Sequence, residues 1–375
     1  MEDKVLHILW NGSIGGTPRA VFQLVQSQLR QSPFVPAVAF AQDGGYYCEE
    51  IKKLGCEVLS LKVKNDRNIF NVLRMKNIFE KYPIHHFHSV EVAMMFASIR
   101  SRNAVRVYTH RGGIFKYRGK RRIRYKIGGW YLRNYFHGLS GNTEHACSSG
   151  ASLFGIESSK WHLTYNGIDF SIFNPMRQKR DVPDEIQFPP DGAVTIGTSA
   201  QLREWKRIDL LLRACAQLPR RSFRLLILGD GPAKQKLEDL ARKLVIADHT
   251  TFAGMKENIE DYIPLMDIFV LPSLGLESFG NAVVEAMSQG IPAIVFSDGG
   301  GLLEHVQNGS NGYIVSSVDE LTERLKSLIK NQLLRSQLGR NAEVFVKTNY
   351  TLERMVASYD NLYISAIDNK KKKNK

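Results

Sequence analysis

The sequence lacks most signals of a membrane-spanning, secreted or zinc-binding protein. No apolar run approaches the roughly 20 residues that cross a bilayer. The chain opens with Met1-Glu2-Asp3-Lys4, which places acids where a signal peptide carries a basic region. Its cysteines are scattered, with no C-x-x-C pair, at Cys48, Cys56, Cys147 and Cys215. This pattern argues against a disulfide framework and a zinc knuckle, and it favours a reducing cytoplasm.

Positive charge is concentrated in the first half of the chain. The net charge of all 375 residues is +14, and residues 1–180 alone carry +15. Residues 181–369 carry −6, and five lysines among the last six residues restore the total. The change of sign predicts two domains and places any anionic partner on the first of them. The charge alone is compatible with a nucleic acid, a lipid surface or an anionic small molecule.

Short β-branched runs alternate with amphipathic stretches, which predicts an α/β protein with parallel sheets. The expected strands are Val5–Leu9, Val35–Phe40, His85–Phe87, Val105–Thr109, Trp161–Tyr165, Val194–Ser199, Phe223–Leu228, Thr250–Phe252, Ile268–Leu271, Ala293–Phe296 and Gly312–Val315. Charge, proline and glycine concentrate at residues 175–192 and predict a linker.

We therefore expect two tandem Rossmann-like, doubly wound domains that face each other across a ligand-binding cleft. The first domain is expected at residues 1–176 and the second at residues 190–350. A helix at residues 351–368 is expected to cross back to the N-terminal domain. Residues 369–375 are expected to form a disordered lysine tail.

The stretch Leu271–Met287 combines a buried strand, a loop and the start of a helix. The strand is expected to end at Pro272 and the helix to begin near Gly280, so the N–H groups of its first turn would favour a phosphate. Glu277 in the loop and Glu285 in the helix are acceptor-only groups that suit paired sugar hydroxyls. The alternative is that Glu277 is a solvated loop acid and Glu285 a surface helix residue.

The two glutamates form E-x7-E within PS-x3-ESFGN-x3-EAM, which resembles the retaining glycosyltransferases of family 4 and their two-domain GT-B fold. Further similarity follows the family's order at Gly15-Gly16, His110, Asn166–Asp169 and Leu228–Pro232. The resemblance implies that Glu285 binds the ribose of a nucleotide-sugar and that Glu277 lies beside its sugar and phosphates. Further donor-binding positions implied in the same way are Gly15, Gly16, Met255, Ser278, Phe279, Gly280 and Asn281.

Transfer from a nucleoside diphosphate leaves negative charge on the β-phosphate, which a cation must stabilise. The sequence has no Asp-x-Asp triplet for a metal, so protein cations are expected to act without a metal or another cofactor. Lys206 matches the family's lysine position. Gln201 occupies the family's arginine position, and Arg203 lies two residues further along. Either Arg203 takes over that role, or Lys206 acts alone, or the enzyme is weakened.

Histidines near strand ends are the candidates in the first half. His110 resembles the family position that contacts the reacting sugar, and the alternative is that it only caps a strand. We assign His110, with Glu277 and Lys206, to the reaction centre and His88 to the surrounding wall. His85, His86 and His88 cluster without acids or cysteines at metal spacing, so we expect that they line the cleft and bind no metal.

Residues 116–131 alternate cations with aromatic and aliphatic residues. The pattern fits either a solvated basic face or docking on an anionic membrane, and no nucleic-acid motif accompanies it. Several members of the family dock this half on the inner leaflet, so we expect a cytoplasmic protein bound peripherally at the inner face of the cell membrane. The expected membrane-binding residues are Lys116, Arg118, Lys120, Arg121, Arg122, Arg124, Lys126 and Trp130.

The sequence thus predicts a retaining, metal-independent glycosyltransferase. It would move a sugar from a UDP- or GDP-sugar to a hydroxyl of a glycan or lipid-linked acceptor, in the synthesis of cell-surface polysaccharide or lipopolysaccharide. One alternative is a nucleotide-sugar epimerase on the same fold. Another is a catalytically silent subunit that binds a sugar nucleotide or a membrane. No motif specifies the donor sugar, its base, the acceptor or the oligomeric state.

Overall fold

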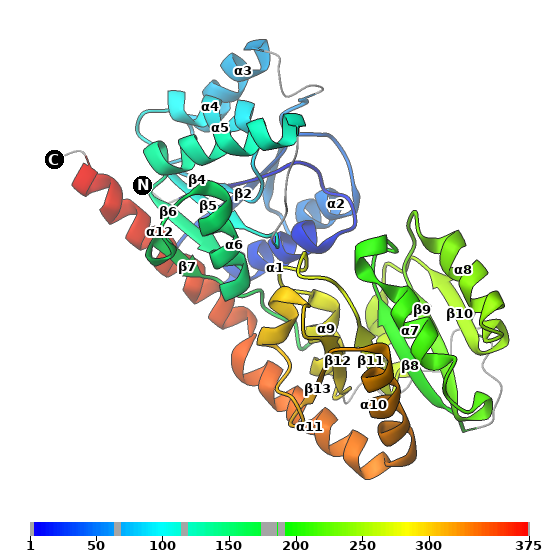
Figure 1. Cartoon of the computed structure of the whole chain (residues 1–375). Coiled ribbons are helices and arrows are strands. Elements are labelled where there is room, and N and C mark those ends of the chain that lie inside the picture. Colours follow the sequence, from blue (N-terminus) through cyan, green and yellow to red (C-terminus); the bar gives the residue numbers. More distant parts are fainter. Residues whose placement is uncertain (1–3, 64–68, 114–118, 174–185, 187–191, 374–375) are drawn as a thin grey trace. The chain divides into compact units, whose positions relative to one another are not determined.

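The computed structural model describes residues 4–63, 69–113, 119–173, 186 and 192–373 (Figure 1). The chain divides into two compact units, residues 1–167 with 352–375 and residues 168–351. Each unit is built on one parallel sheet flanked by helices, so the predicted α/β fold class is confirmed. The expected linker at residues 175–192 lies almost wholly outside the described residues. The cleft expected between the domains stays a prediction.

The first unit has a seven-stranded sheet in the order β3-β2-β1-β4-β5-β6-β7. Its strands are β1 (Lys4–Leu9), β2 (Val35–Phe40), β3 (Glu57–Ser60), β4 (Ile84–Phe87), β5 (Val105–His110), β6 (Gly138–Gly141) and β7 (Trp161–Leu163). Its helices are α1 (Gly16–Gln31), α2 (Tyr46–Lys53), α3 (Ile69–Phe79), α4 (Val92–Arg100), α5 (Gly119–Tyr135), α6 (Glu144–Phe154) and α12 (Leu352–Lys373).

Two helical layers cover the first sheet. On one face, residues of α3, α4, α5 and α6 join the core, among them Phe79, Met94 and Phe154. On the other face, α1, α2 and α12 do so, and Leu24 and Tyr363 pack there against strand residues such as Val107. Strand side chains alternate between the two faces, so the strands β1, β2, β4 and β5 contribute to both cores.

Helix α12 returns the chain to the first unit, where Met355, Tyr359 and Tyr363 are buried. The helix continues to Lys373, so residues 369–373 are helical and not the disordered tail that the sequence predicts. Side-chain hydrogen bonds explain the extension. Asn369 donates to the His137 carbonyl at 3.1 Å and Lys373 to the Phe136 carbonyl at 3.4 Å. None of the helices in the described part of the chain combines the length and the apolar character of a membrane span.

The second unit has a six-stranded sheet in the order β10-β9-β8-β11-β12-β13. Its strands are β8 (Val194–Ser199), β9 (Phe223–Leu228), β10 (Thr250–Gly254), β11 (Ile268–Leu271), β12 (Ala293–Phe296) and β13 (Gly312–Val315). Its helices are α7 (Ile208–Cys215), α8 (Lys234–Lys243), α9 (Asn281–Ser288), α10 (Val318–Lys330) and α11 (Gln332–Asn349).

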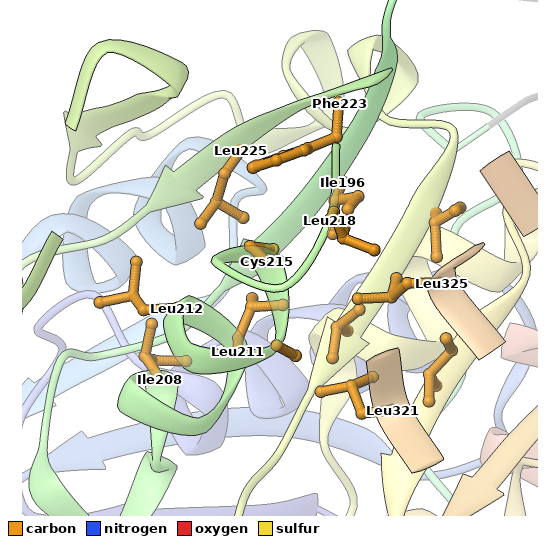
Figure 2. Close-up of a cluster of buried hydrophobic side chains, with 14 of the residues drawn as sticks. Ile196, Ile208, Leu211, Leu212, Cys215, Leu218, Phe223, Leu225, Leu321 and Leu325 are labelled. Atoms are coloured by element: carbon orange, nitrogen blue, oxygen red, sulfur yellow. The ribbon is translucent and has the colours of Figure 1, made fainter. Parts of the chain in front are cut away.

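A large apolar cluster holds helices to this second sheet. Figure 2 shows Ile208, Leu211 and Cys215 of α7 packing among strand residues and the α10 residues Leu321 and Leu325. All five side chains are fully or almost fully buried. Burial of one such aliphatic side chain stabilises a fold by about 1.5–3 kcal/mol. The cluster therefore gives the loops at the strand ends a rigid base.

Candidate functional site

The order of the second sheet reverses between β8 and β11. The chain places β9 and β10 on one side of β8, and β11, β12 and β13 on the other. Loops that leave two such strands at their carboxyl ends diverge, and ligands bind in the gap between them. Residues 200–207 follow β8, and residues 272–280 follow β11. The predicted residues Arg203 and Lys206 lie on the first loop, and Glu277 lies on the second.

These two loops bring a cation and an acid together. Lys206 Nζ forms an ion pair with the Glu277 carboxylate, and the two side chains are only 10% and 15% exposed. The ammonium also lies 4.4 Å from the centroid of the Trp205 ring, a favourable position for a cation. A backbone hydrogen bond of 3.0 Å, from the Leu274 N–H to the Trp205 carbonyl, joins the loops. The pair is therefore held in place at the carboxyl edge of the second sheet, where parallel sheets bind ligands.

The predicted arginine is near the pair in sequence but solvent-exposed. Arg203 Nε donates to the Gln201 side-chain oxygen at 2.9 Å. Gln201, which occupies the family's arginine position, and Arg203, the candidate to replace that arginine, are thus in contact. Whether Arg203 binds the donor stays a prediction.

Arg207, which was not among the predicted site residues, anchors the second loop. Its Nε donates to the Pro272 carbonyl at 2.7 Å, and its Nη1 donates to Asp298 at 2.9 Å. The guanidinium therefore fixes the backbone directly after β11. The sequence showed only a basic turn, because the acceptors lie far along the chain.

Gly280 shapes the start of α9. Its φ of 72° lies in the left-handed region, and a Cβ there would come within 2.1 Å of Leu302 Cδ2 and 3.3 Å of Glu277 Cγ. No side chain caps the helix, and its first turn has no acid. The predicted helix start is therefore confirmed. The glycine is required by the packing of Leu302 and Glu277, in addition to any close approach of a ligand.

Glu285 lies in α9 and is only 2% exposed, so the alternative of a surface helix residue is wrong. Ser278 and Phe279 are also buried, and Asn281 is half-buried. The Phe279 ring packs against His305, whose Nε2 lies 2.5 Å from the Phe279 carbonyl. His305 thus positions the loop before α9, a role that no sequence signal suggested. Met255, which follows β10, is 62% exposed.

In the first unit, Gly15 and Gly16 begin α1 at the carboxyl end of β1. Gly15 is the N-cap, no side chain caps the helix, and the first turn has no acid. Both glycines are exposed, and Pro18 is the third helical residue, close to its expected place. The helix start therefore offers N–H groups and a positive dipole end to an anion. Its role in donor binding stays a prediction.

His110 lies within the core of the first unit. It is 5% exposed, its Nδ1 lies 3.0 Å from the Tyr108 hydroxyl, and its Nε2 lies 3.1 Å from the Ser149 hydroxyl. The ring packs edge-on against Phe154 and Trp161. Burial lowers the pKa of His110 to about 4, so the ring is neutral near pH 7. This placement does not favour contact with a reacting sugar, and the catalytic role of His110 stays a prediction.

The histidines of β4 do not line a cleft, which corrects the expectation from the sequence. His85 points to one face of the sheet and bonds to Ser98 at 2.7 Å. His86 points to the opposite face, where its nitrogens lie 2.9 Å from the Tyr363 hydroxyl and 2.7 Å from the Thr109 hydroxyl. Both rings are fully buried, because successive side chains of a central strand enter the two cores in turn.

One geometric candidate for a metal site exists among the described residues. Ring nitrogens of His7, His86 and His88 lie within 4.8 Å of one another. Hydroxyl groups already occupy both nitrogens of His86, and Arg111 donates to His88 Nδ1 at 3.3 Å. A metal ion would displace these bonds and lie beside a guanidinium charge. We therefore interpret the three rings as a neutral, hydrogen-bonded cluster.

Helix α5 carries part of the predicted membrane-binding stretch. Ile123, Ile127 and Trp130 are 59%, 41% and 48% exposed, and their spacing places them on one face of the helix. Arg122 and Lys126 are also exposed. On the side facing the protein, Leu132 is buried, and Tyr125 and Tyr131 pack against the core. The sequence-based alternative, in which all apolar residues of α5 turn inward, is therefore wrong for the exposed three.

Arg124 differs from the other expected membrane-binding cations. It forms an ion pair with the buried Glu91, and its Nε donates to the Val90 carbonyl at 2.9 Å. These bonds attach α5 to the start of α4 and neutralise the charge of Arg124. Lys116 and Arg118 lie outside the described residues, as do the side chains of Lys120 and Arg121.

Comparisons with known proteins show which family the second unit is similar to and which solved structures share the fold of the chain. Residues 180–345, which include Lys206, Glu277 and Glu285, match the family described as Glycosyl transferases group 1. The fold of the whole chain is similar to that of Anabaena HepE, crystallised with UDP and glucose. The TM-score is 0.81 at 17% identity, covering 96% of this chain and 99% of HepE. The chain is a glycosyltransferase with the GT-B fold.

Sequence relatives of this glycosyltransferase agree. The putative glycosyltransferase EpsF of Bacillus subtilis is 27% identical over 315 residues, covering 78% of this chain and 79% of EpsF. N-acetyl-alpha-D-glucosaminyl L-malate synthase of Bacillus anthracis is 29% identical over 206 residues, covering 54% of this chain and 53% of that one. Other relatives act in O-antigen biosynthesis in Escherichia coli and in lipopolysaccharide core biosynthesis in Rhizobium meliloti. The glycosyltransferase activity predicted from the sequence is thus confirmed.

Proposed function

We propose that the enzyme is a retaining, metal-independent transferase that uses a UDP- or GDP-sugar and a glycan or lipid-linked acceptor. The observation that carries the proposal is the Lys206–Glu277 ion pair, which lies where the second sheet reverses its order. HepE, of similar fold, binds UDP and glucose in its crystal structure, which supports a nucleotide-sugar donor. The relatives in O-antigen and lipopolysaccharide core biosynthesis support a role in cell-surface glycan assembly.

In the proposed donor site, one anion replaces another at Lys206 when the donor binds. Without ligand, the Glu277 carboxylate neutralises Lys206. A diphosphate carries more negative charge than one carboxylate, so it displaces Glu277 from the lysine. Glu277 is then able to accept hydrogen bonds from hydroxyls of the donor sugar, and Glu285 from those of the ribose. When the glycosidic bond breaks, Lys206 and the first N–H groups of α9 stabilise the leaving diphosphate.

Retention follows from attack on the same face as the departing diphosphate. A double displacement requires a carboxylate close behind the anomeric carbon. Glu277 is the candidate, and we assign it to the donor's sugar and phosphates instead. The leaving diphosphate then takes the proton of the acceptor hydroxyl. Proton NMR of the product tests this step: an anomeric configuration equal to that of the donor supports retention, and the opposite configuration excludes it.

A donor panel tests the proposed function. Thermal unfolding with UDP- and GDP-sugars identifies the donor, and adding a membrane or glycan extract should then release the nucleotide diphosphate. Conversion of UDP-N-acetylglucosamine without acceptor would indicate an epimerase instead. Donor binding without release in any extract would indicate a silent subunit. Transfer should be unchanged after treatment with EDTA, and loss that Mg²⁺ or Mn²⁺ restores would contradict metal independence.

We further propose that α5 docks the enzyme on anionic lipid at the inner face of the cell membrane. The exposed stripe of Ile123, Ile127 and Trp130 would enter the interface, and Arg122 and Lys126 would lie near the headgroups. Each such cation contributes about 1 kcal/mol near an anionic surface.

Vesicle co-sedimentation tests this docking. The double variant Ile127→Ser, Trp130→Ala should bind vesicles rich in phosphatidylglycerol at least about tenfold more weakly. Ile364→Ser, a matched change of an exposed residue on α12, should bind as the wild type does. Equal binding to neutral and anionic vesicles, or no effect of the double variant, would contradict the proposal.

A further inference from the structure

Arg111, directly after β5, is a half-buried cation whose hydrogen-bond partners in the described part of the chain are neutral. Its Nε donates to His88 Nδ1 at 3.3 Å, its Nη1 to Asn166 Oδ1 at 2.7 Å and its Nη2 to the Tyr359 hydroxyl at 2.9 Å. The three acceptors come from the ends of β4 and β7 and from α12, and all are buried. Three separate elements thus hold the guanidinium in one orientation.

Among the residues that the structure describes, no carboxylate forms an ion pair with Arg111. A guanidinium stays protonated at any physiological pH and has five N–H groups. The three hydrogen bonds of Arg111 use three of these groups. Fully buried charges in proteins are almost always paired, whereas Arg111 is half-buried and partly open to solvent. The arginine therefore keeps both a full positive charge and two N–H groups for a ligand.

A chain of neutral histidines keeps this arginine in position. Because Arg111 donates to His88 Nδ1, the neutral His88 carries its proton on Nε2, which donates to His7 Nδ1 at 3.0 Å. His7 Nε2–H then donates to Gln28 Oε1 at 2.8 Å. Burial lowers the pKa of His7 to about 4 and also lowers the pKa of His88. The histidines therefore add orientation without adding charge.

The location matches that of a ligand site. The first sheet reverses its order between β1 and β4, and its carboxyl ends carry Gly15-Gly16, His88 and Arg111. The loops after β1 and β4, which carry Gly15-Gly16 and His88, correspond to the loops of Lys206 and Glu277 in the second unit, and Arg111 follows the next strand, β5. The uncapped start of α1 lies at the same edge and also favours negative charge. Two independent features of this edge thus attract an anion.

We propose that Arg111 is the centre of an oxyanion subsite that binds a phosphate group of the acceptor. The inference rests on the proposed transfer reaction, because it assigns this edge to the acceptor and the edge at Lys206 to the donor. Arginine is suited to the task, since its planar fork donates two parallel bonds to phosphate oxygens. His88, Asn166 and Tyr359 act as positioning residues. Lipid-linked acceptors that carry a phosphate fit this chemistry.

Phosphate binding to the full chain tests the subsite. Saturating UDP first fills the donor site, and inorganic phosphate is then titrated while the midpoint of thermal unfolding is recorded. For a dissociation constant of about 1 mM, 10 mM phosphate should raise the Tm by about 3 °C. Arg111→Met should abolish the rise and leave the affinity for UDP unchanged. Arg111→Lys, which keeps the charge without the fork, should keep part of the rise, and this variant also serves if Arg111→Met fails to fold.

Arg102→Met is the matched control, because Arg102 is an exposed arginine before β5, at the other end of that strand. It should respond to phosphate as the wild type does. No rise in the wild type, or an equal rise in Arg111→Met, would overturn the subsite. Loss of UDP affinity in Arg111→Met would assign the arginine to the donor and overturn it as well. If neither UDP nor GDP binds, the proposed donor is contradicted but the subsite is not. Titration of phosphate into Lys206→Ala without UDP then still tests the subsite, because that variant lacks the lysine of the proposed donor site.

Discussion

Both sheets reverse their strand order, and the described side chains near the two points of reversal are neutral overall in the second unit and positive in the first. In the second unit, the point of reversal holds a lysine that is paired with a glutamate. In the first unit, His88 follows β4 at the point of reversal and accepts a hydrogen bond from Arg111, which follows the next strand, β5. The other partners of Arg111 are the neutral side chains of Asn166 and Tyr359. The second site is neutral until a ligand displaces its acid. Among the described residues, Arg111 forms no ion pair with an acid, which agrees with the excess of basic residues in that half of the chain.

The comparison suggests how one fold provides two kinds of anion site. A flexible lysine is able to exchange an internal acid for a diphosphate, so its charge is available only when the donor arrives. An arginine fixed by buried histidines is preorganised, so it binds at little conformational cost. The buried neutral histidines of the first unit, of which His7 and His88 provide this fixing, also make that unit sensitive to acid.

The largest expected difference between the units is in acid stability. Burial lowers the pKa of His7, His85 and His110 in the first unit to about 4, against a usual value of 6.5. Above pH 6.5 neither the folded nor the unfolded chain binds these protons. Between pH 6.5 and 4 only the unfolded chain does, so stability falls as the pH is lowered through this window.

Each such histidine costs about 2 kcal/mol of stability at pH 5. The first unit contains these three and also His86, His88 and His137, whose pKa burial lowers too, so it should lose several kcal/mol, whereas the second should lose much less. Its buried histidine with a comparable shift is His305. Hydrogen exchange of peptides from each unit at pH 7.5 and 5, corrected for intrinsic rates, measures the difference. Equal losses in the two units would show that the neutral histidines are not the cause.

The next largest effect concerns the paired lysine. Lys206→Ala should lower kcat/KM for transfer by about 100-fold to 1,000-fold, because it removes the cation that stabilises the leaving group. Lys236→Ala is a matched control, since this lysine pairs with Glu204 in the same unit but is 76% exposed. Its activity should stay within about twofold of the wild type. Near wild-type turnover in Lys206→Ala would remove the lysine from the reaction.

A smaller effect is expected from the glycine at the start of α9. Gly280→Ala should destabilise the second unit by about 2 kcal/mol or more, because alanine is strained at φ 72° and its Cβ meets Leu302. Urea unfolding followed by circular dichroism measures this loss. Gly309→Ala, which has a φ of 77° but no atom near its Cβ, separates backbone strain from the clash. Equal losses in the two variants would contradict a role for Leu302.

The smallest effect should follow from the exposed arginine of the donor loop. Arg203→Ala should weaken donor affinity by less than about tenfold, since its guanidinium is exposed and bonds only to Gln201 within the described structure. A competition assay with UDP measures the change. A loss as large as that of Lys206→Ala would mean that Arg203 has taken over the family's arginine role.

Much of the fold could be predicted from the sequence, because buried parallel strands are β-branched runs between turn residues. The observed bounds of β2, β8, β9, β11, β12 and β13 are the predicted ones. β3 and β6 were not predicted. β3 is short and partly exposed, and β6 is the glycine-rich run Gly138–Gly141. A Cβ at Gly138 would lie 3.0 Å from Ala366 of α12, so this strand depends on a helix that comes much later in the chain.

Some residues of the candidate site could likewise be predicted from the sequence, and others could not. Lys206 and Glu277 were identified because they follow strands that the pattern located, and the structure joins them in one ion pair. Arg111, Arg207 and His305 were not identified, because each acts through partners that only the tertiary structure brings near. His110 was assigned to the reaction centre from its resemblance to a family position and from its place at a strand end. Its ring lies in the core beside Tyr108, and its catalytic role stays a prediction.

Isothermal titration of UDP and GDP into the wild type, Lys206→Ala and Lys236→Ala tests the central claim most directly. We predict that one of the two nucleotides binds the wild type and Lys236→Ala with equal affinity and binds Lys206→Ala at least tenfold more weakly. Equal affinity of all three proteins would contradict the claim that the lysine between β8 and α7 receives the diphosphate.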